Sequence, residues 1–308
     1  MKKVVVKARD DYALDVHVFE VKNAKAIVQL VHGMEEHQER YEKFIEVLNK
    51  EGFSVVSSDL RGHGSSAKDL GFFKEKEGYL ELIEDEKAIT AYIKKQYSNL
   101  PIYLFAHSFG TIITRVLLEK NSNEYEKVVL SGYPNFQRGA YIGIVVAKAI
   151  EIFRGPKYKS KLLANLSIGR FNKSIQNPTS DCDWISYNEE NIKSYLNDPY
   201  CGIGFTCSAY KDLFHLNIKM HQPKNYQNVN ENLQILLVRG EDDASTGLDK
   251  GAKNSYQVLE KAGFKKIKSV VYPYMRHEIL LELNNQAVYN DIINFYKESE
   301  FEKNEKKK

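Results

Sequence analysis

The stretch LFAHSFGT, residues 104–111, contains a serine whose surroundings are typical of a nucleophile. Ser108 has small residues two positions away on either side, Ala106 and Gly110, and it lies between an apolar run and a helix-like run. Small neighbours allow a sharp strand-to-helix turn that exposes the serine hydroxyl at the carboxyl edge of a sheet. Ala106 replaces the first glycine of the G-x-S-x-G pattern, a change of one methyl group. The alternative interpretation is an ordinary tight turn.

A serine hydroxyl is a weak nucleophile at neutral pH, so it needs a general base and an acid that orients the base. In one arrangement of this chemistry the acid follows the serine in the chain and the histidine comes last. Here RGEDD follows the apolar run ILLV, and YMRHE follows SVVYP. His277 is therefore the candidate base. Asp243 is the candidate acid, and the neighbouring Asp242 and Glu241 remain alternatives at this point.

The other seven histidines fit the role of base less well. Three of them lie near strand ends but precede Ser108: His32, His63 and His107. The other four lack the combination of chain order and strand-end position: His17, His37, His215 and His221. Three strand-end sites in the required order favour His277 over a surface histidine. We expect His32 to be structural.

Acyl transfer also needs backbone N–H groups that stabilise a developing oxyanion. The N–H of Phe109 would face that position at the start of the helix after Ser108. A second donor is expected from VHGM, in which Gly33 would permit an unusual backbone and the N–H of Met34 would face the site.

The elements that must position these residues alternate in the first part of the chain. Apolar runs predict strands at 3–8, 15–20, 25–31, 53–59, 101–106, 127–132, 233–240 and 266–273. Helical periodicity predicts helices at 38–52, 79–98, 111–120, 255–263 and 284–299. Repeated strand–helix units predict an α/β fold with a mostly parallel central sheet and helices on both of its faces.

One long region interrupts this alternation. Residues 133–228 contain helical and irregular segments with many aromatic residues but no β-rich run. The sequence therefore predicts a core formed by 1–132 and 229–300, a mainly helical insertion at 133–228, and a frayed basic tail at 301–308. The apolar segment 141–153 is either a helix that lines an acyl-chain channel or touches a membrane, or a helix buried against the core.

Composition excludes several classes of protein. The 308 residues are 43% hydrophobic and 28% charged with a net charge of +3, which is typical of a soluble globular protein and too small to favour a nucleic-acid partner. No metal site or cofactor is expected, because the cysteines lack metal-ligand spacing and the glycine-rich DLRGHGSS lacks the GK[ST] ending of a phosphate loop. Three widely spaced cysteines and no membrane span or signal peptide predict a cytoplasmic protein.

The chain resembles the monoglyceride lipase and lysophospholipase branch of the α/β-hydrolase superfamily, the serine aminopeptidase-like group. The resemblance rests on VHGMEEHQERYEKF, SSDLRGHGSS, AHSFG, LLVRGEDD and YMRHEILLE, in the family's order. Within the insertion, residues 183–206 resemble the cap of the bacterial members. The resemblance implies that Ser108 is the nucleophile, His277 the base and Asp243 the acid, with Met34 and Phe109 as oxyanion donors. It also implies that the insertion acts as a lid.

We therefore expect a serine hydrolase that cleaves carboxylic esters. The resemblance implies monoacylglycerol, lysophospholipid or short acyl esters as substrates, and contact of the insertion with a membrane surface or lipid aggregate. An amidase, peptidase or thioesterase would use the same site, and Ser108 in place of an aspartate argues against a dehalogenase or epoxide hydrolase. A non-catalytic binding protein on this fold is the alternative from a different class. The oligomeric state stays open.

Overall fold

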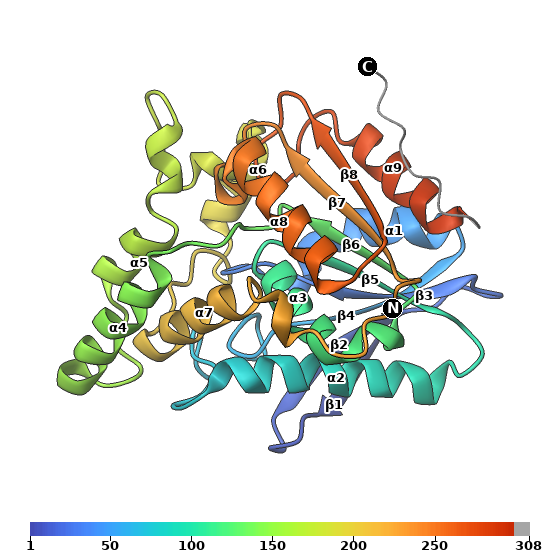
Figure 1. Ribbon diagram of the computed structural model, residues 1–308, viewed down its shortest axis with the longest axis horizontal. Helices are drawn as coiled ribbons and strands as arrows, with labels where there is room; N and C mark the ends of the chain where they lie inside the picture. Colours follow the sequence, from blue (N-terminus) through green and yellow to red (C-terminus); the bar gives the residue numbers. More distant parts are fainter. Residues whose placement is uncertain (299–308) are drawn as a thin grey trace.

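A computed structural model describes residues 1–298, so the predicted tail at 301–308 lies outside the described residues. One eight-stranded sheet crosses the molecule in the order β1-β2-β4-β3-β5-β6-β7-β8 (Figure 1). Its strands are β1 Lys2–Lys7, β2 Ala13–Phe19, β3 Ala26–Val31, β4 Phe53–Ser58, β5 Ile102–His107, β6 Lys127–Ser131, β7 Gln234–Gly240 and β8 Lys266–Tyr272. All eight predicted strands are confirmed.

The sheet is parallel from β4 to β8, and only β1–β2 and β2–β4 pair antiparallel. Every residue of β3, β4, β5 and β6 is buried, as expected of parallel strands covered on both faces. The predicted fold class, an α/β-hydrolase fold, is confirmed.

Helices cover both faces of the sheet. One face packs on α1 Glu42–Lys50 and α9 Gln286–Lys297, and the other on α2 Gly78–Gln96, α3 Phe109–Asn121 and α8 Leu248–Ala262. The predicted helix at 38–52 begins as a 3₁₀ turn, Gln38–Tyr41. Helix α8 begins at Leu248, seven residues before the predicted 255, directly after Gly247 with its φ of 73°. Because the parallel strands run in one direction, their carboxyl ends meet at one edge, where the candidate residues were predicted.

Between β6 and β7 the described chain forms helices and no strand. The helices are α4 Ala140–Arg154, α5 Lys161–Ser167, α6 Glu189–Asn197 and α7 Cys207–Lys219. Short 3₁₀ turns lie at Phe171–Ser174, Asp183–Ile185 and Pro223–Asn225. We call residues 133–228 the insertion. Its last helix, α7, packs on α2 and α3, whereas α4 and α5 lie to one side of the sheet (Figure 1).

The apolar segment 141–153 forms most of α4 and is buried on one side only. Gly143 lies so close to α7 that a side chain there would meet the Phe214 ring at 2.6 Å. Away from this contact, Ile152 is 80% and Phe153 84% exposed. The alternative of a helix buried against the core is therefore wrong for this exposed side of α4, whereas Ile144, Val146 and Ile150 are partly buried against the core.

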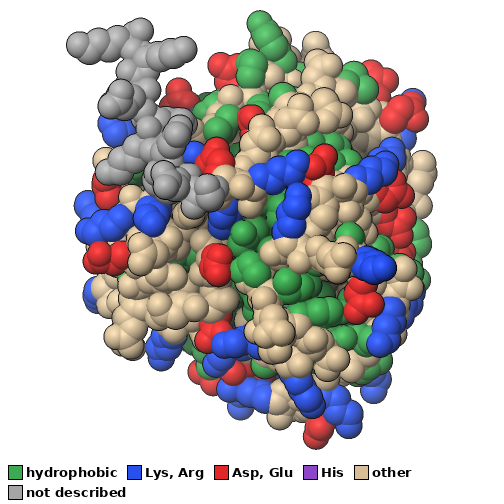
Figure 2. All heavy atoms as spheres, turned by 90° about the vertical axis from the view of Figure 1, so that its right-hand side faces the viewer, with side chains coloured by type: hydrophobic (Ala, Val, Ile, Leu, Met, Phe, Trp, Pro, Cys, Tyr) green, Lys and Arg blue, Asp and Glu red, His purple; other side chains and the backbone are tan. Residues whose placement is uncertain are grey.

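Charges of both signs are mixed on the surface. On the face turned toward the viewer in Figure 2, Lys and Arg side chains alternate with Asp and Glu among the described residues. This mixture agrees with the scattered basic residues of the sequence. None of the described helices is both long enough and apolar enough to cross a membrane.

Candidate active site

Ser108 occupies a sharp turn between β5 and α3. Strand β5 ends at His107 and α3 begins at Phe109, so the serine alone makes the bend, with φ 49° and ψ −117°. A non-glycine residue in this region is strained and persists only where its surroundings hold it. Gly110 explains one small neighbour, because a Cβ there would lie 2.5 Å from the carbonyl oxygens of Val31 and His32. An ordinary tight turn therefore explains this strained serine and its close neighbours less well than a turn that holds a nucleophile.

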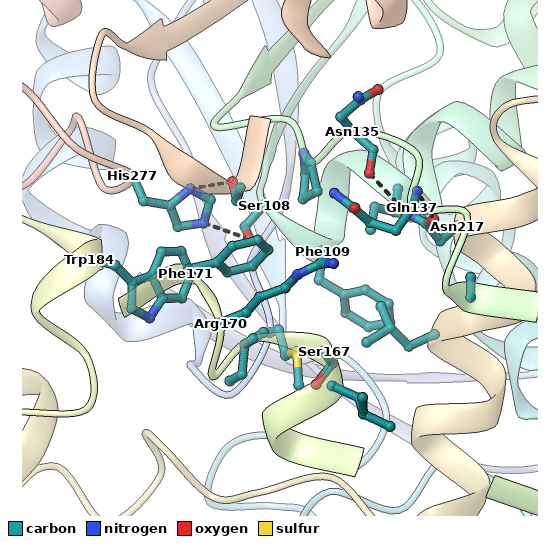
Figure 3. Close-up of a pocket in the computed structure, with 18 of the residues that line it drawn as sticks. Ser108, Phe109, Asn135, Gln137, Ser167, Arg170, Phe171, Trp184, Asn217 and His277 are labelled. Atoms are coloured by element: carbon teal, nitrogen blue, oxygen red, sulfur yellow. Dashed lines mark hydrogen bonds between the residues drawn. The ribbon is translucent and has the colours of Figure 1, made fainter. Parts of the chain in front are cut away.

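The three residues predicted from separate strand ends meet at this edge of the sheet, where Figure 3 shows Ser108 beside His277. The Ser108 hydroxyl lies 2.7 Å from His277 Nε2, and His277 Nδ1 lies 3.0 Å from Asp243 Oδ2. Both His277 and Asp243 are buried. This chain of hydrogen bonds matches the order nucleophile, base, acid.

His277 and Asp243 each stabilise the charged form of the other. Burial by itself would lower the pKa of His277, but the adjacent Asp243 outweighs it and the pKa lies above its ordinary 6.5. Burial would likewise raise the pKa of Asp243, but His277 and Ser245 hold it below its ordinary value. Asp243 therefore stays ionised and favours a proton on His277.

The structure separates the three acidic candidates of the RGEDD loop. Asp243 is buried against His277, whereas Glu241 and Asp242 are exposed. Asp242 instead accepts a hydrogen bond from the hydroxyl of Tyr187, 2.9 Å away in the insertion. Asp243 is thus the acidic residue of this loop that the fold places against His277.

The predicted oxyanion loop follows β3. The N–H of Phe109 belongs to the first turn of α3, where N–H groups have no acceptor within the helix. Met34 lines the same cavity as Ser108. The expected unusual backbone at Gly33 is wrong, because its φ lies outside the left-handed region, which Glu35 adopts instead with φ 57°. Gly33 is required for close approach, since a Cβ would lie 3.1 Å from that of Ser108.

A buried ionic group behind the oxyanion loop was missed by sequence reasoning. Glu36 Oε1 accepts hydrogen bonds from the N–H of Gly33 at 2.5 Å and the hydroxyl of Tyr41 at 2.7 Å. Arg40 donates to Glu36 Oε2 at 2.8 Å and to both carboxylate oxygens of Glu278 at 2.6 and 2.9 Å. Arg40 therefore connects the oxyanion loop with the residue that follows His277. The acidic and basic residues of MEEHQERY were the signal for this ionic group in the sequence, but their spacing alone did not indicate which of them interact.

Sequence reasoning missed two further residues that lie beside His277. Ser245 donates through its N–H and hydroxyl to Asp243 Oδ1, at 2.9 and 2.7 Å, and its Oγ lies 3.0 Å from His277 Nδ1. Trp184 of the insertion packs on the other side, with its ring centre 4.8 Å from that of His277. No sequence spacing indicates Trp184, because the insertion has no regular pattern.

The neighbouring histidines are neutral and structural. Burial lowers the pKa of His32 to about 3, and that of His107 to about 4. His32 Nε2 accepts from the N–H of Leu60 at 2.9 Å, so its Nδ1 carries the proton and donates to the carbonyl of Gly33 at 2.8 Å. The expectation that His32 is structural agrees with these contacts.

A cavity of about 390 Å³ opens beside Ser108, between the sheet edge and the insertion (Figure 3). Its walls are mostly apolar: Phe109 and Ile112 from α3, Ile142 from α4, Leu213 and Phe214 from α7, and Leu166, Ile168, Phe171 and Trp184 from the rest of the insertion. Such a concave, apolar site with a few convergent polar groups is typical of a small-molecule pocket.

One cluster elsewhere has the residue types of a metal site. Ligand atoms of His37, Asp198 and Cys201 lie within 4.8 Å of one another. His37 and Asp198 already share a hydrogen bond of 2.8 Å, and burial strongly raises the pKa of Cys201, which opposes the thiolate that binds metals. All three cysteines are free and buried, as expected of small hydrophobic residues.

Comparison with known proteins identifies the chain's relatives. The family described as "Serine aminopeptidase, S33" matches residues 22–284. The monoacylglycerol lipase of Mycolicibacterium smegmatis is 24% identical over 269 residues, which are 87% of this chain and 86% of that protein.

Two solved structures share the fold. A thermostable carboxyl esterase from Bacillus coagulans superposes with a TM-score of 0.89 at 23% identity, over 96% of this chain and 97% of that one. The monoacylglycerol lipase of Paleococcus ferrophilus gives a TM-score of 0.70 at 22% identity, over 92% and 97%.

The fold and these relatives together class the protein as a hydrolase of carboxylic esters, on the α/β-hydrolase fold. More particularly, the chain belongs to the serine aminopeptidase S33 family. The resemblance drawn from the motifs is therefore confirmed.

Proposed function

We propose that Ser108 attacks the carbonyl carbon of an ester and forms an acyl-enzyme. His277 Nε2 takes the serine proton, and Asp243 stabilises the resulting imidazolium through Nδ1–H. The N–H groups of Met34 and Phe109 stabilise the oxyanion of the tetrahedral intermediate. His277 then protonates the leaving alcohol and later activates the water that releases the acid. The observation that carries the proposal is the Ser108–His277–Asp243 chain of 2.7 and 3.0 Å.

Monoacylglycerols, lysophospholipids and short acyl esters are the proposed substrates. The mostly apolar cavity beside Ser108 supports an acyl chain. We propose that the insertion acts as its lid, since α4, α5 and Trp184 contribute one wall. The relatives named as monoacylglycerol lipases support the same substrate class. The free cysteines support a reducing location such as the cytoplasm.

A peptidase that binds a substrate amine is the weaker alternative. It would need an unpaired carboxylate in the cavity, but the acidic residues of the described lining, Glu36 and Glu278, are both bound by Arg40. An amidase or thioesterase would share the tetrahedral chemistry and is separated by substrate tests. A binding protein without activity would need neither the strained Ser108 nor its bond to His277.

The exposed side of α4 supports contact of the protein with lipid aggregates. Tyr141, Ile142, Val145, Ile152 and Phe153 are all exposed on or beside one side of this helix. Replacing Ile152 and Phe153 by serine should reduce sedimentation with phosphatidylcholine vesicles while hydrolysis of soluble p-nitrophenyl acetate is retained. Equal sedimentation of both forms would contradict the contact.

Labelling with a fluorophosphonate probe tests the nucleophile. We expect the wild-type protein to be labelled and Ser108→Ala to remain unlabelled. Labelling of the variant as strong as that of the wild type would mean that Ser108 is not the nucleophile. A panel of p-nitrophenyl esters from acetyl to palmitoyl, with monoacylglycerol and lysophosphatidylcholine beside it, would define the substrates.

A further inference from the structure

Arg170 is a cationic side chain in the wall of the cavity beside Ser108. It lies just after α5, is half-buried, and extends from the insertion into the cavity (Figure 3). Its guanidinium group lies 5.3 Å from the ring centre of Phe171. Among the described residues it has no carboxylate partner.

This lack of a partner distinguishes Arg170 from the buried arginines. Arg61 is bound by Asp10 and Asp85, and Arg40 by Glu36 and Glu278. Burial lowers the pKa of Arg170, and no carboxylate in the described part of the chain offsets the loss of water. A half-buried guanidinium without a counter-ion is costly, so a ligand that supplies the negative charge would be favoured.

No carboxylate of the described cavity lining is a direct partner of Arg170. The acidic residues of the described lining, Glu36 and Glu278, are held by Arg40 in the core. Lys173, one 3₁₀ turn beyond Arg170, adds a second cation to the same wall. The insertion side of the cavity is therefore both apolar and positively charged.

We propose that Arg170 binds an anionic group of the substrate, so that the enzyme prefers acyl esters that carry a phosphate or carboxylate over neutral esters of the same acyl chain. The inference rests on ester hydrolysis at Ser108 as proposed above. The planar guanidinium matches phosphate and carboxylate oxygens by paired hydrogen bonds. Because Arg170 and Ser108 line one cavity, an anion bound by Arg170 holds the ester near the nucleophile.

The test compares esters of one acyl chain at concentrations below micelle formation. Octanoylglycerol is neutral, octanoylglycerol 3-phosphate carries a phosphate, and the octanoyl ester of 3-hydroxypropanoate carries a carboxylate. We expect kcat/KM of the wild type to be about tenfold higher for at least one anionic ester than for the neutral one, as for one charge-assisted hydrogen bond. The faster of the two anionic esters identifies the preferred anion.

Arg170→Gln should remove this preference, mainly through a higher KM, and Arg170→Lys should restore part of it. Arg138→Gln is the matched control, because Arg138 is exposed and outside the lining, so its charge can be removed without touching the cavity. An equal effect of Arg170→Gln on anionic and neutral esters would overturn the inference, as would a wild type without charge preference.

The experiment separates this inference from the proposed function. If p-nitrophenyl butyrate and all octanoyl esters remain uncleaved, ester hydrolysis itself is wrong. If they are cleaved at rates that ignore charge, only the role of Arg170 is wrong.

Discussion

The two sides of the cavity differ in how firmly their polar groups are held. On the core side His277, Asp243 and Glu36 are buried, and each makes several hydrogen bonds of 2.5–3.0 Å. On the insertion side Arg170 is half-buried beside an aromatic ring and has no acidic partner within residues 1–298. The core side is preorganised, whereas the insertion side leaves a charge that a ligand can satisfy.

This difference separates the chemistry from the choice of substrate. Groups that stabilise a transition state must be fixed before the substrate arrives, which strands and helix ends provide. Groups that select a substrate need only complement its charge and shape. Substitutions on the core side should therefore change rate or stability, and substitutions on the insertion side should change preference.

Asp243→Asn should have the largest effect on the core side. An asparagine cannot stabilise the imidazolium and favours the wrong tautomer of His277, so kcat should fall by about 10⁴. Steady-state hydrolysis of p-nitrophenyl butyrate measures this loss. The control is Asp242→Asn, which removes an exposed carboxylate bonded only to Tyr187 and should matter little. The reverse result would make Asp242 the acid.

Arg40→Met should have the next largest effect, on stability. It leaves Glu36 and Glu278 buried without a counter-charge, which typically costs ~3–5 kcal/mol in the free energy of unfolding. Urea denaturation followed by circular dichroism measures the change. The matched control, Lys193→Met, removes a cation from the exposed pair with Glu190 and should leave the midpoint nearly unchanged. Equal midpoints for both variants would mean that the core side is no more firmly held than the surface.

Sequence patterns predicted the core side well, for a physical reason. Parallel strands buried on both faces require continuous apolar runs, and their carboxyl ends meet at one edge, so chain order placed Ser108, His277 and the RGEDD loop together. Chain order left Glu241 and Asp242 open beside Asp243, and the family resemblance favoured Asp243. The small residue at Gly110 reflects a close backbone approach, because a Cβ there would lie 2.5 Å from the carbonyl oxygens of Val31 and His32.

The insertion side could not be predicted in this way. Arg170, Phe171 and Trp184 reach the cavity through short 3₁₀ turns and loops that lack a repeating pattern. Arg40 and Glu278 are 238 residues apart, and no periodicity connects them. Charge pairing over such distances depends on side-chain geometry, which the fold determines and the sequence pattern does not.

The pH dependence of the rate tests the core side most finely. In the proposed mechanism His277 must be neutral to accept the Ser108 proton, and its pKa lies above 6.5 because Asp243 outweighs the effect of burial. As the pH falls through this pKa, imidazolium forms and kcat/KM should fall, so the midpoint of the acidic limb should lie above pH 6.5. Asp243→Asn removes the charge that raises the pKa, and the residual activity should then titrate at lower pH. A wild-type midpoint below 6.5, or one that Asp243→Asn leaves unmoved, would mean that the Asp243 carboxylate does not control the protonation of the base.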